Sequence, residues 1–171
     1  MRDLLIGALA GIVGTYTMTV AKEELYPALP HRQRYPLPPR EITQDVAERA
    51  LGRSLPPGPM TTATLASHFG FGALCGAAFA ALGLHRRQAV RRGVAYGLGV
   101  WAVSYLGWLP LARILTPATR HPAERNALMI AVHVVWGGVT GLAASRLARS
   151  PMLYGGDDPL PDRARSRRTA P

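Results

Sequence analysis

His68 and His133 are the side chains best placed to do chemistry in this sequence. They begin the segments HFGFGALCG and HVVWGGVTG, and in both a glycine follows the histidine at the fourth and at the eighth position after it. Two histidines on neighbouring helices could ligate a b-type haem, bind a metal with help from Glu23 or Glu24, or exchange protons near neutral pH. We favour a structural role, in which each imidazole bonds a neighbouring carbonyl or hydroxyl. The candidate hydroxyls belong to Thr15, Tyr16, Thr19 and Ser104.

Four long uncharged segments must position these histidines. Asp, Glu, Lys and Arg are all absent from residues 4–21, 64–84, 93–112 and 126–145. A helix needs ~20 mainly apolar residues to cross a hydrocarbon core of ~30 Å, and the polar stripe typical of a soluble bundle is missing. The sequence therefore predicts an all-α integral membrane protein, a bundle of four transmembrane helices in one membrane domain over residues 1–149. The expected spans are about 4–24, 62–84, 92–113 and 125–147.

Both histidines are expected at one depth, ~9–10 Å below the same membrane surface, because each lies six or seven residues into its span. His68 and His133 could therefore meet, and with Glu23 they form the candidate intramembrane polar site. A second polar cluster is expected above them at that surface. It consists of Glu24, Arg113 and Arg125.

The connection between the first two spans is long and rich in proline. Between its proline clusters, EITQDVAERALG (41–52) places apolar residues at helical spacing, and Gly52 can end a helix. This pattern predicts a short amphipathic helix lying at the membrane interface. A helix packed against the ends of the bundle, in contact with water, is an equally good interpretation.

Basic residues predict the orientation of the chain. The net charge is +10, which is typical of charged loops beside membrane spans and does not require a nucleic-acid partner. The short second connection is densely basic, as is the tail over 150–171, which we expect to be disordered. Both termini are therefore predicted to be cytoplasmic. The partners expected are the lipid bilayer and anionic lipids, bound by the tail and by Arg86, Arg87, Arg91 and Arg92.

Each span contains a G-x-x-x-G pair, which in membranes allows helix backbones to approach closely. The expected packing glycines are Gly7, Gly11, Gly72, Gly76, Gly93, Gly97, Gly137 and Gly141. The shared H-x-x-x-G-x-x-x-G pattern of the second and fourth spans suggests two copies of one helical hairpin. We favour packing within the chain, and a homo-oligomer contact is the alternative.

Several short motifs resemble the YagU-type family of bacterial inner-membrane proteins. They are YPLPPR (35–40), SHFGFG (67–72), ILTPATRHP (114–122) and NALMIAVHVVWG (126–137). The resemblance implies an inner-membrane location and a role in acid tolerance, and it brings no catalytic residues.

Motifs for phosphate binding, dinucleotide binding, zinc binding and serine hydrolysis are absent from the sequence, so we expect no enzyme and no metal. Three functions stay open. The first is a non-enzymatic protein of the bacterial inner membrane, related to the envelope or to acid stress. The second is a small proton, ion or solute transporter or channel subunit that acts as an oligomer. The third is a haem b protein that uses His68 and His133 as ligands.

Overall fold

A computed structural model of the chain describes residues 1–34 and 38–150, and within these ranges every regular element is a helix. Four helical segments are long and apolar enough to cross a membrane. Three of them are α1 (Arg2–Leu25), α3 (Pro57–Ala81) and α6 (Ala123–Ala148). The other is the continuous run of α4 (Ala89–Ala102), η3 (Val103–Trp108) and α5 (Leu109–Leu111), which we call the third span. The prediction of an all-helical chain with four such segments is confirmed. The expected disordered tail and the start of YPLPPR lie outside the described residues.

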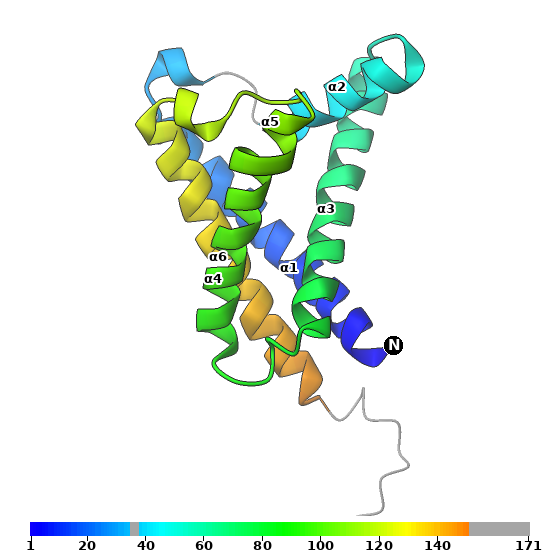
Figure 1. Cartoon of the computed structure of the whole chain (residues 1–171), viewed down its shortest axis with the longest axis vertical. Coiled ribbons are helices and arrows are strands. Elements are labelled where there is room, and N and C mark those ends of the chain that lie inside the picture. Colours follow the sequence, from blue (N-terminus) through cyan, green and yellow to red (C-terminus); the bar gives the residue numbers. More distant parts are fainter. Residues whose placement is uncertain (35–37, 151–171) are drawn as a thin grey trace, which may run out of the picture.

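The remaining elements are short and lie at one end of the bundle, which we call the α2 end. There α1 and the third span finish, and α3 and α6 begin. The opposite, N-terminal end carries the start of α1 and the loop after α3 (Figure 1). A helix forms where the sequence predicts one near 41–52. The elements of the α2 end are η1 (Tyr26–Ala28), η2 (His31–Gln33), α2 (Pro38–Leu51) and η4 (Ala118–Arg120).

The four long segments do not form a closed ring. α1 packs along both α3 and α6, and α4 packs along α6, whereas α3 and α4 make few contacts with each other. The spatial order is therefore α3–α1–α6–α4, and α1 is visible behind the space between α3 and α4 in Figure 1. α2 packs on α3 at the α2 end. This open arrangement leaves α3 and the third span with much of their surface exposed.

Glycines make the contacts within each packed helix pair. A Cβ atom added at Gly11 would overlap the carbonyl oxygen of Gly72, and one added at Gly137 would overlap that of Gly93. Close backbone approach of this kind is the usual basis of helix packing in membranes, where lipid tails do not drive helices together by a hydrophobic effect. Two sets of these contacts pair glycines with glycines: Gly7 and Gly11 against Gly72 and Gly76, and Gly93 and Gly97 against Gly137 and Gly141. We call these contacts the α1–α3 and α4–α6 glycine seams.

The N-terminal half of the bundle is densely packed. Ile6 and Ala10 of α1, Phe79 of α3 and Ala144 of α6 form a cluster whose members are at most 1% exposed. The Tyr96 ring of α4 packs against this cluster, with its centroid 5.4 Å from that of Phe79. Side chains of α1, α3, α4 and α6 therefore fill the interior of this half of the bundle.

The third span changes its helical register near the α2 end. Residues Val103–Trp108 form a π-turn, and Gly107 leaves helical geometry with φ −111° and ψ −107°. Pro110 follows directly; it has no backbone N–H to donate to the carbonyl four residues earlier, which disrupts a regular helix at this point. The turn places Ser104 and Tyr105 in the interior, where both are buried.

Candidate functional site

A cavity of about 250 Å³ lies between the helices in the half of the bundle nearer the α2 end. All four long segments line it, and Pro39 and Ile42 of α2 add to the wall. Most lining side chains are apolar or aromatic. His68 and His133 both line the cavity. The histidines of the two H-x-x-x-G-x-x-x-G segments therefore lie at one site. Such a mainly apolar hollow with a few polar groups is typical of a small-molecule site.

His133 is held by its own helix. Its Nδ1 atom lies 2.7 Å from the carbonyl oxygen of Met129, and because a carbonyl only accepts, Nδ1 is the donor. In the neutral imidazole, Nε2 is then an acceptor, and it has no hydrogen-bond partner among the described residues. The side chain is only 8% exposed, and the Tyr105 ring meets its ring edge-on at 6.0 Å. His133 thus offers one unsatisfied acceptor within a buried site.

His68 contributes a second imidazole from α3. It is half-buried, and neither ring nitrogen forms a hydrogen bond with a described residue. The two histidines are not hydrogen-bonded to each other, and neither uses the hydroxyl groups that the sequence suggested. Of the partners expected for the two histidines, only a backbone carbonyl is found, that of Met129, which bonds His133. Two polar rings therefore share the cavity and leave ring nitrogens available.

Glu23 does not join the histidines. Its carboxylate is 66% exposed and pairs with the neighbouring Lys22 at 2.8 Å, and it is absent from the cavity wall. Lys22 itself lines the cavity, with its side chain 25% exposed. No group of three or more metal-binding side chains gathers in the described parts of the chain. The polar site therefore contains a lysine where the sequence suggested a glutamate.

The expected cluster of Glu24, Arg113 and Arg125 is not assembled. Glu24 is exposed and forms no ion pair within residues 1–34 and 38–150, and the Arg113 side chain is exposed. Arg125 is 3% exposed, and its guanidinium donates a 3.0 Å hydrogen bond to the carbonyl of Gln33. The Gln33 amide in turn donates to the Glu124 carboxylate at 3.1 Å. Arg125 thus fastens η2 onto the start of α6.

The floor of the cavity is formed where three helices cross. The Thr15 hydroxyl of α1 donates to the carbonyl of Gly11 at 2.8 Å and accepts the indole N–H of Trp136 at 3.1 Å. A Cβ atom at Gly72 would overlap the Thr15 hydroxyl, so α3 also lies against it. The same hydroxyl therefore joins α1, α3 and α6 beneath the histidines.

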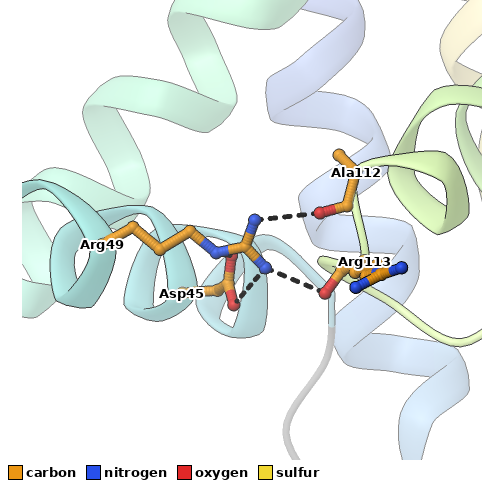
Figure 2. A network of polar contacts seen from close by, with 4 residues as sticks. All are labelled: Asp45, Arg49, Ala112 and Arg113. Carbon is orange, nitrogen blue, oxygen red and sulfur yellow. Dashed lines mark hydrogen bonds and ion pairs between the residues drawn. The ribbon is translucent and has the colours of Figure 1, made fainter.

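Two polar contacts bridge the open side between α3 and the third span. Toward the N-terminal end, the Tyr96 hydroxyl donates to the carbonyl of Cys75 at 3.0 Å. At the α2 end, Arg49 reaches from α2 to the last carbonyls of the third span, those of Ala112 and Arg113, each at 2.9 Å (Figure 2). Asp45 orients the same guanidinium, with its carboxylate 2.8 Å from Nε. We call this network the Arg49 clasp.

The clasp follows from helix electrostatics. The last four carbonyls of a helix have no partner within it, and the C-terminal end carries partial negative charge. Arg113 has a left-handed backbone, with φ 57°, which ends the third span there.

On the other side of the cavity, the Thr43 and Ser67 hydroxyls are 3.1 Å apart and tie α2 to α3. α2 is thereby fixed to both sides of the opening.

Phe71 and Trp108 mark where the cavity reaches the surface. Both line it, and they are 43% and 42% exposed. They belong to α3 and η3, the two segments that make few contacts with each other. The cavity therefore opens sideways, between the two bridging contacts, toward the apolar flank of the bundle.

Comparison with known proteins found no match: neither a family model, nor a curated protein, nor a solved structure is similar to this chain.

Sequence reasoning missed Arg49, Lys22 and Tyr105. Arg49 binds backbone carbonyls, which leave no signal in residue type. Tyr105 enters the site through the π-turn, which only the neighbouring Gly107 and Pro110 could have suggested. This arrangement is suited to binding a small ligand, because two imidazoles, several hydroxyls and a lysine line an apolar hollow. An activated nucleophile paired with a general base is not among the cavity-lining residues.

Proposed function

We propose that this protein is a non-enzymatic component of the bacterial inner membrane that binds a small lipid-soluble molecule within its helical bundle. One observation carries the proposal: the cavity holds His133, more than nine-tenths buried, with an acceptor nitrogen that no described residue satisfies. A ligand in the cavity that donates to this nitrogen would gain a hydrogen bond in an apolar site. The similarity of the sequence motifs to the YagU-type family supports the inner-membrane location and suggests a role in envelope or acid stress.

Charge distribution supports an orientation with both termini in the cytoplasm. Among residues 1–34 and 38–150, the N-terminal end carries seven arginines and one acidic residue, Asp3, whereas the α2 end has nine basic and six acidic residues. Basic residues beside membrane spans are enriched on the cytoplasmic side. The exposed Arg86, Arg87, Arg91 and Arg92 would then lie beside anionic lipid headgroups. The two glycine seams likewise support an origin from two helical hairpins.

Binding fits the geometry better than conduction does. A proton or ion path would have to continue from the cavity through the cluster of Ile6, Ala10, Phe79 and Ala144, which is closed within one chain. A haem is also poorly matched, because a cavity of about 250 Å³ is smaller than the ~300–1,000 Å³ of ordinary cofactor sites. Transport would need an additional copy or a rearrangement of the bundle.

The proposal can be tested through Cys75, which lines the cavity and is the single cysteine of the chain. Delipidated protein in detergent is labelled with N-ethylmaleimide, with and without a bacterial total lipid extract. We expect the extract to slow labelling several-fold in the wild type, and purified phospholipid alone to have little effect. His133→Ala should abolish this protection, whereas His31→Ala, at an exposed site in η2, should retain it. Equal labelling rates with and without extract in the wild type would contradict the proposal.

A further inference from the structure

The cavity presents hydrogen-bond acceptors from two different helices. A neutral imidazole always has one acceptor nitrogen; in His133 this is Nε2, because Nδ1 donates to Met129. His68, from α3, has no hydrogen-bond partner among the described residues and adds a second acceptor to the same hollow. A guest that satisfies both acceptors carries two hydrogen-bond donors joined by a spacer.

The size and the walls of the cavity restrict that spacer. A volume of about 250 Å³ exceeds the ~150 Å³ of an apolar cavity that binds benzene, so it can accommodate one six-membered ring with two oxygen substituents. Four aromatic side chains contribute to the wall, and aromatic rings favour stacked or edge-on contact with another ring. They are Phe71, Tyr105, Trp108 and Trp136.

The sideways opening indicates what is attached to the ring. The cavity reaches the surface between Phe71 and Trp108, on the apolar flank formed by α3 and η3. The same two segments carry further exposed apolar side chains, including Leu74 of α3 and Val103 of η3. A hydrocarbon chain leaving the ring would therefore remain in lipid, and the guest could enter from the bilayer without crossing water.

We infer that the cavity binds the head of a membrane hydroquinone or a similar two-hydroxyl phenol, with its hydrocarbon tail leaving between α3 and η3. The inference rests on the proposed function and names its ligand class. One hydroxyl donates to Nε2 of His133 and the other to the acceptor nitrogen of His68. Binding involves no electron transfer and no covalent step.

The test compares three compounds with matched tails: decyl-hydroquinone, its dimethyl ether and decanoic acid. The ether keeps the ring and the tail but has no donor, and the acid keeps a donor but has no ring. Binding to the wild-type protein in nanodiscs is followed by tryptophan fluorescence, since Trp108 and Trp136 line the cavity. We expect the hydroquinone to bind about ten- to fiftyfold more tightly than the ether, the effect of about two net hydrogen bonds, and more tightly than the acid.

Variants locate the effect. His133→Phe keeps a ring of similar shape and should reduce the difference between hydroquinone and ether, because only the hydrogen bond to His68 remains. His31→Phe should leave the difference unchanged. If His133→Phe does not fold, the comparison of compounds on the wild type still decides. Equal binding of hydroquinone and ether, or tighter binding of the acid, would overturn the inference. If no compound binds while lipid extract still protects Cys75, the hydroquinone inference is wrong and the proposed function stands. If lipid extract also fails to protect Cys75, the inference and the proposed function are both wrong.

Discussion

Arg49 and Ala112 are joined by a hydrogen bond of 2.9 Å between the guanidinium of α2 and the last turn of the third span. The contact connects residues that are far apart in the chain, and it crosses the side on which α3 and α4 fail to pack. Together with the Thr43–Ser67 contact, it fixes α2 across the α2 end of the cavity.

The Arg49 clasp should limit the motion of α2. Arg49→Ala removes two charge-assisted hydrogen bonds and an ion pair; because the side chain is about half exposed, we expect a loss of only about 1 kcal/mol of stability. Amide hydrogen exchange over residues 38–51 should accelerate. Arg49→Lys should not restore protection, since an ammonium cannot reproduce the planar fork. Arg53→Ala, at an exposed site without a partner among the described residues, is the control, and equal exchange in both variants would refute the role of the clasp.

The α4–α6 glycine seam should be intolerant of a single methyl group. Gly137→Ala would place Cβ on the carbonyl oxygen of Gly93, and we expect it to lower the free energy of unfolding by about 1–3 kcal/mol through overpacking. Gly138→Ala is a matched control, because its Cβ would meet only the Val94 side chain, at an ordinary 3.6 Å. Thermal unfolding in detergent measures both variants. Similar Tm values for the pair would show that the seam is not tight.

Thr15 should control the environment of Trp136. Thr15→Val keeps the shape but removes the acceptor of the indole N–H, so we expect a loss of about 1 kcal/mol, within the range measured for hydrogen bonds between membrane helices. Tryptophan emission should shift to the blue as the indole loses its polar partner. Thr15→Ser retains the hydroxyl and should emit as the wild type does. An unchanged spectrum in Thr15→Val would argue against this hydrogen bond.

Acid should loosen the end of α2. Hydrogen bonds from Ser54 and Gln44 hold the pKa of the exposed Glu48 below its ordinary value. A carboxyl whose pKa is lowered by folding stabilises the folded form above its unfolded pKa, and this contribution disappears as the pH falls through the folded pKa. Hydrogen-exchange protection factors near residues 48–54, which correct for the slower intrinsic exchange in acid, should therefore decrease at acidic pH. Ser54→Ala should raise the Glu48 pKa measured by NMR, and an unchanged pKa would contradict the contact.

The four long helices were predictable because each depends on a property of local sequence, a run of about twenty uncharged residues. The helix near 41–52 was predictable for a similar reason, since Pro and Gly bound an amphipathic pattern. The histidines could be placed at one depth by counting residues from the ends of the spans. Each of these inferences needs only the periodicity of a single helix.

The rest depends on how helices meet. The cavity exists because α3 and α4 do not pack along each other to close the ring. No pattern of residues in the sequence predicted that these two helices would stay apart. Glu23 was expected to face inward from its position at the end of a span, but the adjacent Lys22 offers its carboxylate a partner at the surface. The π-turn depends on how Gly107 and Pro110 are accommodated against neighbouring helices. A single sequence carries little information on such choices.

The order α3–α1–α6–α4 also determines how the molecule can deform. The two glycine seams join the helices into two stiff pairs, since sliding either pair would force backbone atoms into overlap. A rotation of one pair against the other about the α1–α6 contact would keep both seams and change the width of the gap beside Phe71 and Trp108. Such a hinge movement would act on the two contacts that bridge this side, the Arg49 clasp and the Tyr96–Cys75 hydrogen bond.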